Sequence, residues 1–106
     1  MCAIGTSIPY GVSKAGMLQL TRGLALALSP EVRVNSVSPG SIVSRWLGDL
    51  VGEDVAAERW AKESGTIPLG AVATPEDVAQ AIVSLIEARF VTGQDVIVDG
   101  GKHLLY

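Results

Sequence analysis

The sequence predicts an α/β fold, in which helices cover a parallel sheet. The patterns along the 106 residues follow the order helix, strand, broken helical segment, helix, strand. Apolar residues make up 48% of the chain and aromatic residues only 5%, a balance typical of Ala/Val/Leu-rich α/β proteins. The first strand ends at a Pro-Gly pair, and open parallel sheets bind ligands at the carboxyl ends of their strands. With a right-handed helical crossover between its strands, the chain is expected to form one edge of a doubly wound sheet.

The first element is expected to be a helix from about Ser7 or Ile8 to Leu28. Ser7 is a suitable N-cap, a proline fits the first turn because its missing N–H needs no partner there, and Ser29-Pro30 ends the pattern. Apolar residues cover most of its circumference, which predicts burial on several sides, either within one subunit or at a subunit interface. A low-profile strip suits the close approach of another helix: Gly16, Leu20, Gly23 and Ala27.

Residues Val32 to Ser38 are expected to form the first strand, which Pro39-Gly40 breaks at its C-terminal end. Because Gly40 has no side chain, the backbone there is able to approach a bound group, and the residues after it offer N–H donors. Taken alone, Ser-Pro-Gly is only a common turn signal.

The second half of the chain is expected to be helical until a last strand. Residues 45–67 give a helical pattern that Gly48 and Gly52 interrupt. A further helix opens at Thr74-Pro75, with acidic residues near the positive end of its dipole, and ends near Arg89. Its predicted buried stripe consists of Val78, Ile82, Leu85 and Ile86. A strand from Gln94 to Val98, a sharp loop at residues 99–101 and a tail that suits packing on a neighbouring subunit complete the chain.

Tyr10 and Lys14 form the one pair of residues that indicates chemistry. Four residues apart on a helix, the two side chains lie on one face, one turn from each other. An ammonium beside a phenol stabilises the phenolate, and a phenol that ionises more easily is able to exchange protons near neutral pH. Tyr-x-x-x-Lys is a short pattern that many chains contain by accident, so its neighbours decide how it is interpreted.

Those neighbours resemble the short-chain dehydrogenase/reductase family. The similarity covers essentially the whole chain but only the C-terminal half of the family pattern. It rests on five stretches in the right order: Pro9 to Gly16, Val32 to Gly40, Pro68-Leu69-Gly70, Thr74 to Ala79, and Thr92 to Gly101 with its Thr92-Gly93-Gln94 and Val98-Asp99-Gly100-Gly101 ends.

The resemblance implies the C-terminal part of a doubly wound Rossmann-type parallel sheet, with residues 1–106 as half of one domain. It implies an oxidoreductase that interconverts a ketone and a secondary alcohol with NAD or NADP. Tyr10 and Lys14 would be catalytic and would also contact the cofactor, beside Pro39 and Gly40. Ile42 and Ser44 would hold the nicotinamide carboxamide, although many members have threonine in place of Ser44.

The resemblance also sets what the chain is expected to lack. The family's Gly-rich pyrophosphate turn and its catalytic serine and asparagine have no match in this sequence, so we expect the chain by itself to be incomplete. Residues 45–67 would cover the substrate, with glycine hinges and with Trp46 and Trp60 as pocket walls. The plainer interpretation makes both tryptophans packing residues, and for Trp60 it is the stronger one.

Charge and cysteine content argue against several other classes of protein. The net charge of −3 and the absence of a basic cluster disfavour a nucleic-acid surface. The single cysteine, Cys2, excludes an intrachain disulfide and leaves no metal-ligand pattern. No stretch is both apolar and long enough to span a membrane, so a cytoplasmic enzyme is expected.

Two functions from different classes therefore stay open. The first is the NAD(P)-dependent oxidoreductase, acting on a small carbonyl or alcohol substrate as a homo-oligomer built through the helix 8–28. The second is a non-catalytic remnant that acts as a dimerisation or association module through the same helix and the tail. A third, weaker hypothesis combines them: the chain complements a separate N-terminal fragment.

Overall fold

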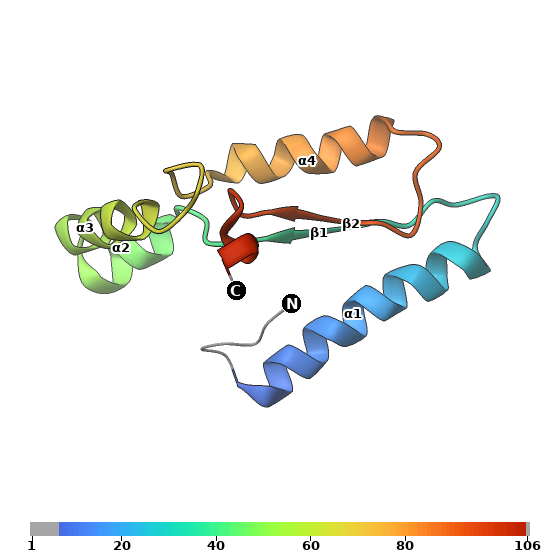
Figure 1. Ribbon diagram of the computed structural model, residues 1–106, viewed down its shortest axis with the longest axis horizontal. Coiled ribbons are helices and arrows are strands. Elements are labelled where there is room, and N and C mark those ends of the chain that lie inside the picture. Colours follow the sequence, from blue (N-terminus) through green and yellow to red (C-terminus); the bar gives the residue numbers. More distant parts are fainter. Residues whose placement is uncertain (1–6, 106) are drawn as a thin grey trace.

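A two-stranded parallel sheet lies between helices in the computed structural model, which describes residues 7–105 (Figure 1). Cys2 and Tyr106 lie outside the described residues. The order of elements confirms the predicted α/β fold. The elements are α1 (Ile8–Ala27), β1 (Ser36–Pro39), α2 (Arg45–Val51), α3 (Glu53–Ser64), α4 (Pro75–Glu87), β2 (Asp95–Val98) and the 3-10 helix η1 (Lys102–Leu105).

The sheet is parallel, as predicted. β1 pairs with β2 in a register that sets Ser36 opposite Asp95 and Pro39 opposite Val98. The connection between the two strands runs through α2, α3 and α4, which is the helical crossover that a parallel pair requires. α4 and α1 lie on opposite sides of the strand pair (Figure 1).

β1 is shorter than the sequence predicts, because its expected first half is bonded to a loop and not to a strand. The Val34 N–H donates to Thr92 Oγ1 at 3.1 Å, and the Val34 carbonyl accepts the Gly93 N–H at 2.7 Å. The Arg33 side chain donates to the carbonyls of Leu85, Ile86 and Val91, at 2.7 to 3.1 Å. Residues 32–35 therefore fasten the end of α4 to the loop before β2.

α1 begins and ends close to the predicted residues, but the first of the two predicted kinds of burial, within one subunit, is wrong for residues 7–105. Burial of α1 at a subunit interface stays a prediction. Ser7 is the N-cap, and its Oγ accepts the Tyr10 N–H at 3.3 Å. Only Ala25 of α1 is buried, at 4% exposure. Most of its large apolar side chains are exposed because no other described element packs along the helix: Ile8, Val12, Met17, Leu20, Leu24 and Leu26.

α4 has the predicted start, with a complete capping box. Thr74 Oγ1 accepts the Asp77 N–H at 3.3 Å, and Asp77 Oδ2 accepts the Thr74 N–H at 2.8 Å. The predicted buried stripe is wrong, since no residue of α4 is buried. Ile82 and Ile86 are exposed, because among the helices and strands of residues 7–105 α4 packs mainly against the two short strands.

The small core lies around α2, α3 and the turn that follows them. Its members are Leu47, Ala56, Ile67 and Val72, whereas the fifth buried apolar residue among those described, Ala25, lies on α1 near Gly93. Gly52, with φ of +89°, separates α2 from α3, whereas Gly48 lies inside α2 without ending it. No helix within the described residues has the length and apolar character needed to cross a membrane.

Candidate active site

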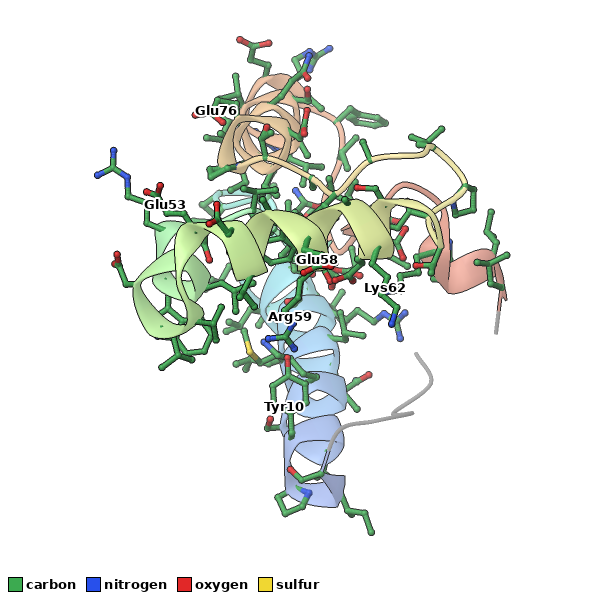
Figure 2. All side chains as sticks on the ribbon, turned by 90° about the vertical axis from the view of Figure 1, so that its left-hand side faces the viewer. Tyr10, Glu53, Glu58, Arg59, Lys62 and Glu76 are labelled. Atoms are coloured by element: carbon green, nitrogen blue, oxygen red, sulfur yellow. The ribbon has the colours of Figure 1, made fainter. Side chains whose placement is uncertain are left out.

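Tyr10 and Lys14 share one face of α1, as their spacing predicts. Lys14 Nζ lies 5.4 Å from the centroid of the Tyr10 ring. The Tyr10 side chain is 49% exposed and Lys14 is half-buried, so both are open to solvent. Figure 2 shows Tyr10 on α1, on the side of the molecule opposite Glu76 of α4. The helix alone therefore places an ammonium against a phenol at an accessible position.

Gly40 is needed for a close approach between the two strand ends. Its N–H donates to the Val98 carbonyl at 3.0 Å. A Cβ on Gly40 would lie 2.7 Å from Asp99 Cβ and 3.2 Å from Asp99 Cα, closer than carbon atoms are able to pack. The sequence predicts that this glycine faces a bound group. The described contact gives a structural reason for the glycine, the close approach of Asp99 after β2, and the role toward a bound group stays a prediction.

Ile42 and Ser44 lie in the segment that leads from Gly40 to α2. Ile42 forms an isolated parallel bridge with Ala73, in which the Val43 N–H donates to the Ala73 carbonyl at 2.9 Å. Because backbone groups alternate in direction along an extended segment, the N–H and C=O of Ile42 itself point away from Ala73. Ser44 is the N-cap residue of α2 but makes no side-chain capping bond.

This donor set fits a primary carboxamide such as that of nicotinamide. A carboxamide has one acceptor oxygen and two N–H donors. The Ile42 N–H and C=O and the Ser44 hydroxyl supply a donor, an acceptor and a group able to do either. The N-terminal end of α1 lies toward the same end of the long axis of the molecule as the C-terminal ends of both strands (Figure 1).

A pocket of about 470 Å³ lies between β1 and α4, and a second of about 920 Å³ lies beside Ser44, between α2, α3 and the start of α4. Trp60 lines the second pocket together with Val43, Ala56 and Ala57. Trp46, in contrast, is 69% exposed and does not line it. Segment 45–67 thus contributes most of this wall, with Trp60 as its aromatic member.

Glu63, at the end of α3, joins three segments in a cluster that sequence analysis missed. Its Oε1 accepts hydrogen bonds from Lys102 Nζ at 2.7 Å and from Ser41 Oγ. These partners are 39 and 22 residues away in sequence, so no local pattern marks them. The hydrogen bond from Lys102, followed by that from Ser41, holds the pKa of the Glu63 carboxyl below its ordinary value.

A second cluster that sequence analysis missed lies on one face of the sheet, where side chains of β1 meet Asp95 of β2. Ser36 Oγ and Ser38 Oγ both donate to Asp95 Oδ1, at 2.7 and 2.8 Å. The two serines alternate along β1, so they point to one face, where the register sets Asp95 opposite Ser36. Only the strand register, which the sequence did not specify, brings them together.

Asp99 and His103 form a third cluster, for which the sequence did carry a signal in the spacing of four residues. His103 Nδ1 lies 2.9 Å from Asp99 Oδ1, and the N–H groups of Gly101 and His103 donate to the same carboxylate. Burial raises the pKa of the Asp99 carboxyl, but the hydrogen bonds from His103 and Gly101 outweigh it, so the pKa lies below its ordinary value. The cluster closes the turn from β2 into η1.

Comparison with known proteins gives evidence on the family that is independent of the site geometry. A protein-family model described as enoyl-(acyl carrier protein) reductase matches residues 2–103. The short-chain dehydrogenase/reductase homolog YusR of Bacillus subtilis is 42% identical over 100 residues, which cover 94% of this chain and 73% of the relative. 2-(S)-Hydroxypropyl-CoM dehydrogenase 3 of Xanthobacter autotrophicus is 39% identical over 105 residues, which cover 95% of this chain and 41% of the relative.

Solved structures that are similar to this chain also include a dehydrogenase. The crystal structure of a small-chain dehydrogenase in complex with NADPH has a TM-score of 0.75 and 30% identity, over 85% of this chain and 40% of that one. The chain thus spans about 40% of the dehydrogenases from Xanthobacter and from this crystal structure, and most of YusR.

Proposed function

This chain belongs to the short-chain dehydrogenase/reductase family, and we propose that it forms the C-terminal half of an NAD(P)-dependent oxidoreductase domain. The proposed reaction interconverts a ketone and a secondary alcohol. The observation that carries the proposal is the placement of the Lys14 ammonium over the Tyr10 ring, on an accessible face of α1.

Tyr10 is the proposed acid and base. In the reducing direction its hydroxyl donates a proton to the carbonyl oxygen of the substrate, and in the oxidising direction the phenolate takes the proton back from the alcohol. Lys14, whose ammonium lies over the Tyr10 ring, is proposed to stabilise the phenolate by its positive charge. Its proposed second role, a hydrogen bond to the nicotinamide ribose, follows from the family resemblance. When bound, the nicotinamide supplies or accepts the hydride.

The segment after β1 is the proposed cofactor contact. Ile42, through its backbone, and Ser44, through its hydroxyl, match the donors and acceptors of the nicotinamide carboxamide. Pro39 and Gly40 set the direction in which this segment leaves the sheet. The pocket between α2 and α3, with Trp60 in its wall, is the proposed place for the carbon skeleton of the substrate.

Two measurements test the proposal. In the first, the chain is titrated with NADH and with NADPH, and the fluorescence of the reduced nicotinamide reports binding. In the second, Tyr10→Phe is introduced into the complete enzyme. We expect turnover to fall by about 10²–10⁴-fold while the affinity for the cofactor stays nearly unchanged, because only the proton donor is lost. Full activity of Tyr10→Phe would exclude Tyr10 as the acid.

A second candidate function is supported by the exposed apolar face of α1. Its low-profile strip remains open, because a Cβ built on Gly16 or Gly23 would meet no atom within 4 Å apart from the adjoining residues and backbone of α1 itself. A second helix could approach closely there, either from another copy of the chain or from a separate fragment that supplies the other half of the fold. The chain would then act as an association module, and the enzyme itself would be a homo-oligomer through the helix 8–28.

Light scattering separates the two candidates. A dimer that binds neither NADH nor NADPH would favour the association module. Saturable binding of either cofactor would favour the oxidoreductase. Mixing the chain with the N-terminal half of a related dehydrogenase tests complementation directly, since activity should appear only in the mixture.

A further inference from the structure

We propose that Glu63 is a positioning residue that holds segment 41–44 against α3 and η1. The cofactor role of that segment rests on the proposed function, but the restraint itself does not. One carboxylate oxygen of Glu63 accepts hydrogen bonds from Lys102 Nζ, at 2.7 Å, and from Ser41 Oγ. It therefore joins the helix, the loop after β1 and the C-terminal turn at a single atom.

Ser41 lies at the point of its loop where such a restraint has most effect. The backbone on either side is already bonded, with the Gly40 N–H donating to Val98 at 3.0 Å and the Val43 N–H donating to Ala73 at 2.9 Å. The bond from Ser41 to Glu63 adds a side-chain restraint between these two points. Ile42 lies next to Ser41 between these two points, and Ser44 follows directly after the second, so their orientation depends on the restraint.

The partners are sheltered enough for these bonds to matter. The side chains of Lys102 and Glu63 are 28% and 26% exposed, and the bonds involve an ionised acceptor. Charge-assisted hydrogen bonds are stronger than neutral ones, and partial burial reduces the competition from water. The cluster is thus better suited to fix a loop than an exposed ion pair, which contributes little.

Glu63 also connects the loop to the pocket wall. Trp60, which lines the pocket beside Ser44, lies one turn before Glu63 on α3. The same end of α3 is fastened to the following turn, because Ser64 Oγ accepts the Val72 N–H at 3.2 Å. A displacement of α3 that widens the pocket would therefore pull on Ser41, which couples the pocket to the loop.

Amide hydrogen exchange on the intact chain tests the restraint. In Glu63→Ala, we expect the amides of Gly40 and Val43 to exchange about tenfold faster, as expected for the loss of one hydrogen bond to a charged group. Glu63→Gln keeps an acceptor oxygen and should recover part of the protection. Glu58→Ala is the matched control, since Glu58 lies on the same helix and is exposed (Figure 2).

The proposal would be overturned if the amides of Gly40 and Val43 exchanged at the same rate in Glu63→Ala as in the unaltered chain. It would also be overturned if Glu58→Ala raised these rates as much as Glu63→Ala does. If Glu63→Ala does not fold, Ser41→Ala decides the matter, because it removes only one hydroxyl and leaves Glu63 and Lys102 in place. It should speed the exchange of Val43, and an unchanged rate would reject the restraint.

Cofactor affinity separates this proposal from the proposed function. If the unaltered chain binds NADH or NADPH, Glu63→Ala should weaken binding about tenfold and Glu63→Gln should restore part of it. Faster exchange with an unchanged dissociation constant would reject the positioning role. If the unaltered chain binds neither dinucleotide, the proposed function fails for this chain, whereas the exchange rates still decide whether Glu63 restrains the loop.

Discussion

The ammonium of Lys14 lies over the ring of Tyr10, with Nζ 5.4 Å from the ring centroid. This is within the range in which a cation is attracted to an aromatic face. The relationship depends on little more than the helix, because residues four apart in an α-helix are neighbours and Ser7 caps the first turn. The relative position of Tyr10 and Lys14 is therefore determined even though most of α1 is exposed.

Lys14→Met should remove the charge and keep most of the side-chain volume. In the complete enzyme we expect turnover to fall by about 10²–10⁴-fold, because the phenolate of Tyr10 loses the positive charge that stabilises it. Steady-state kinetics measure the effect, with Lys62→Met on the exposed face of α3 as the control. Similar activity for both variants would show that Lys14 has no part in proton transfer.

Gly40→Ala should destabilise the chain by about 1–3 kcal/mol, the range for overpacking at a tight contact. The added methyl group would lie 2.7 Å from Asp99 Cβ, so the ends of β1 and β2 would have to separate. Urea denaturation followed by circular dichroism gives the free energy of unfolding.

Gly16→Ala provides the matched control for this glycine. Gly16 is helical, and a Cβ there would meet no atom within 4 Å beyond the adjoining residues and backbone of α1, so alanine should stabilise the chain by up to about 1 kcal/mol. If both alanines had the same effect on the free energy of unfolding, the contact between Gly40 and Asp99 would not be what requires glycine.

Arg33→Met should loosen the attachment of the end of α4 to the segment that precedes β1. Arg33 donates to the carbonyls of Leu85 and Ile86 at the end of α4, which lose this donor once the guanidinium is gone. It also donates to the Val91 carbonyl, which keeps a bond from Asn35 Nδ2 at 2.9 Å. We expect a loss of about 1.5–3 kcal/mol in the free energy of unfolding. Arg33→Lys should recover little, because an ammonium does not reproduce the forked geometry of the guanidinium.

Arg89→Met serves as the control, since Arg89 is an exposed arginine just after the same helix. Its loss should change the free energy of unfolding by less than about 0.5 kcal/mol. A comparable effect of the two methionines would argue that net charge, and not the bonds of Arg33, stabilises this region.

The stability of the chain should fall in acid, partly through Glu63. The pKa of its carboxyl in the folded chain lies below the ordinary 4.5 because Lys102 and Ser41 bond the ionised form. A lowered pKa contributes stability above the unfolded value, and this contribution is lost as the pH falls through the folded value. Thermal unfolding from neutral pH to about pH 3 should therefore show a decline that begins near pH 4.5.

Glu63→Gln should flatten the upper part of that decline, whereas Glu58→Gln should not. The remaining acid sensitivity is expected from Asp77 and Asp99. The backbone N–H and then the hydroxyl of Thr74 lower the pKa of Asp77, and hydrogen bonds from His103 and Gly101, which outweigh burial, lower that of Asp99. Identical pH profiles for Glu63→Gln and the unaltered chain would contradict a stabilising role for the ionised Glu63.

Much of the fold was predictable from local signals. The ends of α1, the capping box at Thr74 and the order of elements follow from caps, prolines and apolar spacing, which act within a few residues. Tyr10 and Lys14 were predictable as a pair for the same reason. The predictions that failed concern the burial of α1 within one subunit, the buried stripe of α4 and the start of β1, all of which depend on what packs or bonds against the segment from elsewhere.

The sequence by itself determined the order of the helices and strands, and which face of α1 holds the ammonium and the phenol, because both depend on short-range backbone geometry. Only the tertiary structure decided that Glu63 meets Ser41 and Lys102, that Asp95 meets Ser36 and Ser38, and that Gly40 faces Asp99. These contacts arise where a parallel register and a long crossover bring distant segments together. No spacing within one segment encodes such a meeting, since the distance between the partners is set by the path of the whole chain.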